Sequence, residues 1–380
     1  MKILLIGEYS RLHNSLKEGL LHLGHEVTII GDGDRFKNYP VDILLKNNFS
    51  NGVLKILRKI VYRLFKIDLQ SISKQKQFNA QKDNLKGYDV VQLINERSFK
   101  TIPQTEKKLL KYIFENNKKV FLLSCGCDFI SVKYAMEKKY RYSILTPFFE
   151  NKATTKKFGP VLLYLEKSHI ELHDYIYKNI SGVIATDIDY HLPLINHKAY
   201  LGLIPNPINT DHIKNNFNLI SDRIVIFHGI NTENYFKKGN DLFEKALDII
   251  EKKHKKKVEI ITTRNIPYRD YLNHYKKAHI LLDMVYAYDQ GYNALEAMAG
   301  GKVVFTGAEQ EWLDYYGLKK DTVAINAEPD VEHIVSKLEW LINNPEQINK
   351  ISKNARQFIE EKHNYINIAQ EYIDHWTTHY

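Results

Sequence analysis

A loop and helix between Ala278 and Trp312 hold residue types that bind a nucleotide diphosphate. An apolar strand is expected from His279 to Met284, and Gly291 opens a helix after a tyrosine-rich turn. Glycine permits a positive φ or a close backbone approach, and the free N–H groups at a helix start attract phosphate. Glu296 lies about one and a half turns further on, where it would repel phosphate but accept hydrogen bonds from a ribose diol. This spacing predicts a nucleotide-diphosphate site.

Short apolar runs alternate with helical stretches along the whole chain, and the runs are typical of parallel strands buried on both faces. In the first half they are Lys2–Ile6, Glu26–Ile30, Val90–Ile94, Val120–Ser124 and Gly182–Ala185, with helices such as Leu12–Leu23 and Glu106–Asn116 between them. In the second half they are Arg223–Phe227, Val258–Thr262, Ile280–Met284, Lys302–Phe305 and Thr322–Ile325. We therefore expect an α/β protein with two Rossmann-like, doubly wound parallel sheets.

Prolines and asparagines between Pro205 and Asn218 break both patterns, so we place a domain boundary there and expect domains at 1–205 and 206–364. Ligands of open α/β sheets lie at the carboxyl ends of the strands, so the cleft between the domains is the expected site. Polar or small residues at those ends are Gly7-Glu8, Asn95, Asp128, Gly229, Thr263-Arg264 and Asp289. Gly7 and Gly229 permit the turn after a first strand, and the same small residue lets backbone N–H groups reach an anion.

Several blocks of the second half resemble a known family. One block is similar to the "G-(F/Y)…LEAMA.G.(P)V" block of glycosyltransferase family 4, the retaining enzymes of GT-B architecture. Its matching residues are Gly291-Tyr292, Leu295-Glu296-Ala297-Met298-Ala299, Gly301 and Val304. The "IPNGVD" hinge of that family resembles Ile204-Pro205-Asn206 together with Asn209-Thr210-Asp211. Its "GR….KG" loop resembles Gly229 together with Lys238-Gly239. A weaker similarity lies at Asn354-Ala355-Arg356. The resemblance runs from about residue 200 to residue 376 and is general before that.

The resemblance implies an acceptor-binding first domain, a nucleotide-sugar-binding second domain, and a last helix, about 365–380, that packs back on the first domain. It makes Lys238 the diphosphate ligand, with Lys237 as the alternative. The expected nucleotide-sugar-binding residues are Glu296, Gly291, Tyr292, Asn293, Gly229, Arg264, Asp283 and Gly7, and the expected acceptor-binding residues are Glu8, Asn95 and Arg97. The expected catalytic residues are Lys238, Asp289 and Asp128.

Two positions depart from the family pattern. The first glutamate of the family's E-x7-E signature is Tyr288 here, and the arginine expected after Gly229 is Ile230. Either Asp283, Asp289 and Arg264 take over these roles, or the transfer chemistry is altered.

Composition limits the classes of partner. The 380 residues carry a net charge of +9, which suits an anionic partner, but the lysines are scattered and no nucleic-acid-binding signature is present, so we expect no nucleic-acid partner. No run is long and apolar enough to cross a membrane, so we expect a cytoplasmic protein. Cys125 and Cys127 are too close for an unstrained disulfide, and neither the histidines nor the cysteines have a metal-ligand spacing. We expect no cofactor and no metal, and structural roles for His13 and His25.

The segment 53–67, VLKILRKIVYRLFKI, has a helical period that separates basic from apolar residues and contains no acidic residue. The basic set is Lys55, Arg58, Lys59, Arg63 and Lys66, and the apolar set is Val53, Leu54, Leu57, Ile60, Val61, Leu64 and Phe65. One interpretation is an ordinary domain helix with a solvated basic face. The other is an interfacial helix on the inner face of the cell membrane, beside a lipid-linked acceptor.

We therefore expect a retaining glycosyltransferase that moves a sugar from a nucleotide-sugar donor to the hydroxyl of a glycan or lipid-linked acceptor, in surface polysaccharide or glycan biosynthesis. Two alternatives stay open. A GT-B sugar-nucleotide epimerase has the same architecture, and Tyr288 in place of the family's glutamate suits a non-catalytic scaffold that binds a sugar nucleotide or a glycan.

Overall fold

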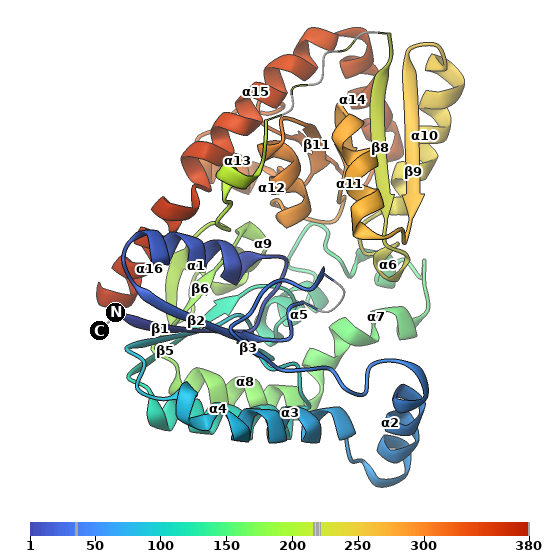
Figure 1. Cartoon of the computed structure of the whole chain (residues 1–380). Coiled ribbons are helices and arrows are strands. Elements are labelled where there is room, and N and C mark those ends of the chain that lie inside the picture. Colours follow the sequence, from blue (N-terminus) through green and yellow to red (C-terminus); the bar gives the residue numbers. More distant parts are fainter. Residues whose placement is uncertain (35–36, 216, 218–219, 221, 379–380) are drawn as a thin grey trace.

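A computed structural model describes residues 1–34, 37–215, 217, 220 and 222–378. Its strands form two parallel sheets that lie one above the other in Figure 1. Helices cover both sheets, and most of the strands that the sequence indicated are buried and apolar. The edge strand Val258–Arg264 differs, because only its first residue is buried. The expected fold, two doubly wound α/β domains, is confirmed.

The first sheet has seven strands in the order β3-β2-β1-β4-β5-β6-β7, and each neighbouring pair is parallel. The strands are β1 (Lys2–Ile6), β2 (Glu26–Gly31), β3 (Ile43–Leu44), β4 (Val90–Leu93), β5 (Lys119–Ser124), β6 (Gly182–Ala185) and β7 (Tyr200–Leu203). The strand order reverses between β1 and β4. The loops after these two strands therefore meet where doubly wound sheets bind ligands.

The second sheet has five strands in the order β12-β11-β10-β8-β9, again with parallel neighbours. The strands are β8 (Ile224–Ile230), β9 (Val258–Arg264), β10 (Ile280–Leu282), β11 (Val303–Thr306) and β12 (Ile325–Asn326). Here the reversal lies between β8 and β10. The segment after β10 begins with Asp283, and it carries most of the candidate site.

The α-helices of the first half are α1 (Leu12–His22), α2 (Gly52–Phe65), α3 (Leu69–Ala80), α4 (Pro103–Asn116), α5 (Phe129–Met136), α6 (Thr146–Phe149), α7 (Thr155–Leu162), α8 (Lys167–Asn179) and α9 (Ile188–Leu194). Those that follow are α10 (Asn240–His254), α11 (Tyr268–Lys277), α12 (Tyr292–Ala299), α13 (Gln310–Tyr316), α14 (Val331–Asn343), α15 (Pro345–Lys362) and α16 (Tyr365–Thr378). In the described part of the chain, each helix is too short or too polar to span a bilayer.

The chain passes between the two sheets twice, and the two passages lie side by side. Ile208 pairs with Asn364 in a parallel bridge, and the Ile208 N–H donates to the His363 carbonyl at 2.7 Å. The His363 ring also contacts the Asn206 carbonyl at 2.8 Å. The predicted boundary at 205/206 lies at the first passage and stays a prediction; Asn218, the end of the expected boundary segment, lies outside the described residues.

After the second passage, α16 returns to the first sheet (Figure 1). Tyr372 and Trp376 lie in the same apolar cluster as Ile3 and Leu5, and the Trp376 indole N–H donates to the Gln92 side chain at 3.0 Å. The backbones of α1 and α16 approach closely at Gly19. A Cβ atom there would lie 2.2 Å from the Tyr365 carbonyl oxygen.

Candidate active site

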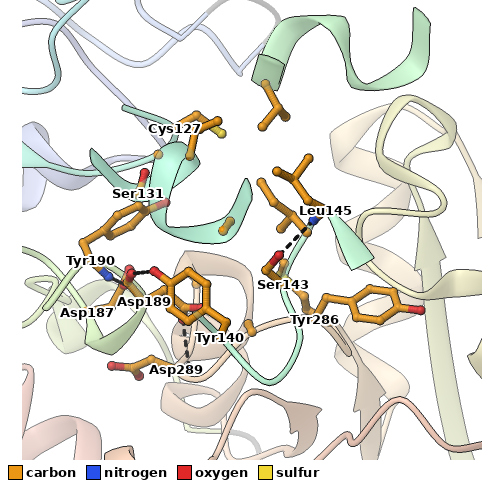
Figure 2. Close-up of a pocket in the computed structure, with 18 of the residues that line it drawn as sticks. Cys127, Ser131, Tyr140, Ser143, Leu145, Asp187, Asp189, Tyr190, Tyr286 and Asp289 are labelled. Carbon is orange, nitrogen blue, oxygen red and sulfur yellow. Dashed lines mark hydrogen bonds between the residues drawn. The ribbon is translucent and has the colours of Figure 1, made fainter. Parts of the chain in front are cut away.

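A pocket of about 160 Å³ opens between the two sheets (Figure 2). The first half of the chain lines it with the loop after β5, helix α5, the segment 140–145, Val161 of α7 and the start of α9. The second half contributes the segment 284–291, which follows β10. The pocket is therefore built from carboxyl ends of strands in both sheets, as expected for a doubly wound pair.

Three aspartates stand together on one side of this pocket: Asp187, Asp189 and Asp289 (Figure 2). Asp189 and Asp289 each bind the backbone of the opposite half. The Tyr288 N–H donates to Asp189 at 3.0 Å, the Asp289 N–H donates to it at 3.1 Å, and the Ile188 N–H donates to Asp289 at 3.0 Å. We call this pair the aspartate clamp; it joins the start of α9 to the segment after β10.

Burial dominates the electrostatics of these three carboxyls. It raises the pKa of Asp189 to about 7, with a further rise from the neighbouring charge of Asp289, and it raises the pKa of Asp289 to about 7. The pKa of Asp187 is also raised, by burial first and then by Asp189 and Asp289. A proton held within the group relieves the repulsion between three acids in a small space. Among the described residues, no three His, Cys, Asp or Glu side chains are arranged to hold a metal ion.

Lys238 contacts the segment after β10 by an ion pair with Asp283. The Lys238 ammonium and the Asn293 amide both donate to the same Asp283 oxygen at 2.8 Å. Tyr271 holds the other side of Asn293, donating to its amide oxygen at 2.7 Å. Asn293 is the second residue of α12, so this network places a cation beside the start of that helix.

The start of α12 is open. Its N-cap residue, Gly291, is exposed, and no side chain caps the helix. The expected reason for this glycine was partly wrong: its φ is −80°, which other residues adopt, and a Cβ atom would meet nothing within 4 Å. The space beside it is therefore free, and the first N–H groups of α12 stay available to a ligand.

Glu296 lies on α12 and faces cations of the first half. Burial raises its pKa, while Lys37 and Arg11 lower it in part. Its carboxylate forms no hydrogen bond with the described residues. Tyr292, at the start of the same helix, donates its hydroxyl to the Pro207 carbonyl at 2.8 Å and so joins α12 to the first passage between the sheets.

Gly229 does not lie in the expected turn, whereas Arg264 lies at the carboxyl end of its strand, as the sequence suggested. Gly229 was expected in the turn after a strand, but it is inside β8, paired in register with Thr263 of β9. A side chain there would collide with the Tyr271 ring, since a Cβ atom would be 2.4 Å from it, so packing explains the glycine. Arg264 is half exposed and forms an ion pair with Glu244. Its role in place of the missing arginine at 230 stays a prediction.

Gly7 and Glu8 follow β1 at the reversal of the first sheet. Gly7 has a φ of +91°, and a Cβ atom would lie 2.2 Å from Ile94, so only glycine fits this close turn. Glu8 is buried, which raises its pKa to about 7. One carboxylate oxygen accepts from the Asn14 backbone at 3.0 Å and from its amide at 2.6 Å; the other has no partner. His13 contacts the Gly7 carbonyl at 2.7 Å, a structural contact of the kind expected.

Asn95, Arg97 and Asp128 hold the loops of the first half together. The Asn95 amide donates to the carbonyls of Cys125 and Cys127 at 2.7 and 3.0 Å, and Arg97 donates to the Thr101 carbonyl at 3.1 Å. Asp128 caps α5 by accepting from the Ser131 N–H at 2.7 Å, and its second oxygen accepts from Ser124. Both Asp128 oxygens thus have internal partners.

Tyr288, at the position of the family's first glutamate, is buried at the contact between the two halves. Its hydroxyl accepts from the Arg141 N–H at 2.8 Å, and its ring packs against Tyr140 and Tyr142. The Arg141 guanidinium lies over the same ring and pairs with Glu309 and Glu311. We call residues 140–142 the strap, because they tie the first half to the second beside the pocket.

Sequence reasoning missed Asp187, Asp189 and Arg141. The two aspartates follow β6 directly, in the run Ala185-Thr186-Asp187-Ile188-Asp189, so the rule that located Asp289 also applied to them. Arg141 had no such signal. It lies in an irregular segment between α5 and α6, and only the three-dimensional structure shows what it contacts.

Comparison with known proteins adds a family match and a fold. Residues 238–374 match a family model described as glycosyl transferase-like. A search of curated protein sequences finds no match.

Solved structures resemble the chain over its full length. Sucrose-phosphate synthase from Thermosynechococcus elongatus has a TM-score of 0.62 at 13% identity, covering 100% of this chain and 99% of that one. HepE from Anabaena, in complex with UDP and glucose, has a TM-score of 0.59 at 14% identity, covering 100% of both chains. A putative UDP-N-acetylglucosamine 2-epimerase from Listeria monocytogenes has a TM-score of 0.53 at 12% identity, covering 99% of this chain and 95% of that one. At these identities the likeness shows the fold alone, and the fold is GT-B.

Proposed function

We propose that this protein transfers a sugar from a nucleotide-sugar donor to the hydroxyl of an acceptor. The observation that carries the proposal is the position of Lys238 next to the uncapped start of α12, beside the pocket. Asp283 holds Lys238 there, because it accepts hydrogen bonds from both Lys238 and Asn293. The match of residues 238–374 to a glycosyl transferase-like family supports it. So does the complex of HepE with UDP-glucose, a protein of the same fold.

In this proposal the donor diphosphate lies at the start of α12. The helix N–H groups and Lys238 stabilise the charge that grows on the phosphate oxygens as the bond to the anomeric carbon breaks. Glu296, further along the same helix and without a hydrogen-bond partner in the described structure, binds the ribose hydroxyls. Gly291 leaves the space through which the diphosphate approaches the backbone.

The transferred sugar lies in the pocket beside the three aspartates. A pocket of about 160 Å³ is too small for a whole nucleotide sugar, because ligands of that size fill several hundred cubic ångströms. Asp187 and Asp289 bind sugar hydroxyls, and Asp289 takes the part of the missing glutamate. The new bond joins the anomeric carbon to the acceptor oxygen, and the acceptor proton passes to the departing diphosphate. The resemblance of the 291–304 block supports retention at the anomeric carbon.

The acceptor enters from the first half of the chain. Glu8 faces this side with one carboxylate oxygen unpartnered and buried, so an acceptor hydroxyl is the natural donor to it. Asn95 and Arg97 support the neighbouring loops. We assign the reaction to surface polysaccharide or glycan synthesis in the cytoplasm, without a metal or other cofactor.

Product analysis tests the proposal. The protein is incubated with a panel of UDP, GDP and ADP sugars, with and without candidate glycan acceptors, and released nucleoside diphosphate and sugar products are separated. We expect diphosphate release that depends on an acceptor, together with an elongated acceptor.

Two other results would replace the proposal. The acid group at Asp187 and Asp189 also suits proton transfer at a sugar carbon, so an epimerised sugar without acceptor elongation would indicate the epimerase function. Stabilisation of the protein by a sugar nucleotide, without turnover, would indicate the non-catalytic scaffold, in which Tyr288 has closed the sugar site.

A further inference from the structure

Helix α2 stands apart from both sheets at one end of the molecule (Figure 1). None of its residues is buried. Nine of the fifteen large apolar side chains that are exposed in the described structure lie in the short segment 53–67: Val53, Leu54, Ile56, Leu57, Ile60, Tyr62, Leu64, Phe65 and Ile67. Contiguous apolar surface of this kind marks an interaction site.

The exposed residues of α2 are ordered by the helical period. Val53, Ile56, Leu57, Ile60 and Leu64 recur at steps of three and four and therefore share one face. Val53 is 80% exposed and Leu64 is 67% exposed, so this face points away from the body of the protein.

A basic stripe adjoins the apolar face. Lys55, Lys59, Arg63 and Lys66 lie beside it and are exposed, and no acidic residue occurs between Gly52 and Ile67. Arg58, the remaining basic residue of the segment, is occupied: it donates to Asp68 and to Gln70. These bonds fasten α2 to the start of α3 and fix the direction of its apolar face.

We propose that α2 docks this protein onto an anionic lipid surface. Its 14 residues make a helix about 21 Å long, too short to cross a hydrocarbon core of about 30 Å, so it lies in the interface with its apolar face among the lipid chains. The four exposed cations then face the lipid phosphates. A second copy of the chain is a poor partner for the same face, because pairing brings two sets of uncompensated cations together.

The docking surface belongs to the chain whether or not the proposed transferase function is correct, so its test measures binding and not turnover. The full chain is sedimented with vesicles of mixed phosphatidylglycerol and phosphatidylcholine, and with vesicles of phosphatidylcholine alone, at low and at high salt. We expect binding to the anionic vesicles at low salt, with loss of binding on neutral vesicles and at high salt.

Three variants make the test specific. Lys55→Glu, Lys59→Glu and Arg63→Glu together should weaken binding by at least about 100-fold. Loss of each basic residue near an anionic surface costs about fivefold, and the added carboxylates repel the anionic lipids. Ile60→Glu with Leu64→Glu should abolish insertion. The matched control is Lys252→Glu, Lys255→Glu and Lys256→Glu, the same charge change near the end of α10, which should retain most of the binding.

All substituted side chains are exposed, so each variant should fold, and a melting curve checks this. The proposal is overturned if the wild-type protein stays in the supernatant with anionic vesicles, or if the two triple variants lose binding equally. It is also overturned if the wild-type protein forms a dimer that Ile60→Glu with Leu64→Glu separates, since α2 would then be the contact between two copies.

Discussion

At the scale of single residues, the candidate site depends on how one carboxylate organises its neighbours. Asp283 accepts from Lys238 and from Asn293 through the same oxygen. The cation is thereby held next to the first turn of α12, where it adds to the positive end of the helix dipole. Glu296 stands further along the same helix, away from the open N–H groups. In the proposed function, phosphate and ribose therefore bind separate groups of one short helix.

Replacing Lys238 or Glu296 with alanine should lower turnover about 30- to 1,000-fold, equivalent to about 2 to 4 kcal/mol of transition-state stabilisation. Loss of Lys238 removes charge from the leaving diphosphate, and loss of Glu296 removes the ribose contact. Steady-state rates with the active donor measure both effects.

Lys237→Ala is the matched control, because Lys237 precedes Lys238 but lines a separate pocket of about 220 Å³ with Phe158 and Phe236. It should keep nearly the wild-type rate. A larger loss in Lys237→Ala than in Lys238→Ala would move the diphosphate contact to Lys237.

The sequence indicated part of this site. Gly291, Asn293, Glu296, Asp283 and Lys238 do lie around one helix start, because they are close in sequence or at the ends of neighbouring strands. Asp128 and Asn95 also lie at strand ends, yet their partners are a cap and two carbonyls. A polar residue after a strand has the same sequence signature whether it binds a ligand or holds a loop, so sequence alone does not separate the two.

At the scale of elements, the contact between α1 and α16 shows how a helix from the far end of the chain becomes part of the first sheet's core. Gly19 allows the close approach, and Ala369 lies opposite it. The apolar face of α16 then covers Ile3 and Leu5 of β1.

Gly19→Ala should destabilise the protein, although alanine normally favours a helix by about 1 kcal/mol over glycine. The new methyl group would meet the Tyr365 carbonyl oxygen and the Ala369 side chain and push the helices apart, at a cost of about 1 to 3 kcal/mol. Urea unfolding measures the change. Gly159→Ala, in α7, is the control, because a Cβ atom there meets nothing within 4 Å and the variant should be neutral or more stable. Equal effects of the two substitutions would contradict the predicted clash.

Most strands were predictable because parallel strands buried on both faces are continuous apolar runs. Ten expected strands correspond to ten of the twelve observed, with ends that shift by a few residues. The exceptions are β3, which has two residues, and β7, whose Gly202 has a φ of +123° next to an irregular register with β6. Strands this short or irregular show too few residues of a strand pattern to be recognised in the sequence. They lie at the two edges of the sheet and are strands because each pairs with its one neighbouring strand.

At the scale of the whole molecule, the aspartate clamp and the strap hold the two halves together around the pocket. Both rest on contacts between distant parts of the chain: Asp189 with the segment after β10, and Arg141 with Glu309 and Glu311. The two passages of the chain between the sheets also lie together, at the bridge between Ile208 and Asn364.

The clamp should make the closed, folded form less stable as the pH rises. Asp189 and Asp289 have pKa values of about 7 in the structure against a usual 3.8, so the folded state holds protons that the unfolded chain has lost. The contribution of these two carboxyls to the free energy of unfolding is fully present below about pH 4. It falls as the pH rises to about 7, and it is lost above that pH.

Thermal unfolding from pH 5 to 8.5 measures the effect. The variant Asp189→Asn with Asp289→Asn should show a smaller fall in melting temperature over this range than the wild-type protein, by roughly 4 to 8 °C if the clamp contributes about 2 kcal/mol. Asp314→Asn, an exposed carboxylate on α13, serves as the control and should follow the wild-type curve. Parallel curves for the wild-type protein and the double variant would exclude a titrating clamp.

The position of Trp376 has a consequence for how the protein is made. The ribosome completes the seven strands of the first sheet by Leu203, but the residue that fills the space against Phe121 comes at the far end of the chain. At about 5 to 20 residues per second, the intervening stretch of roughly 170 residues takes about 9 to 35 seconds to synthesise. During that time the nascent first domain leaves uncovered the apolar surface that α16 later occupies, and a chaperone that binds such surfaces is expected to hold it until the last helix emerges.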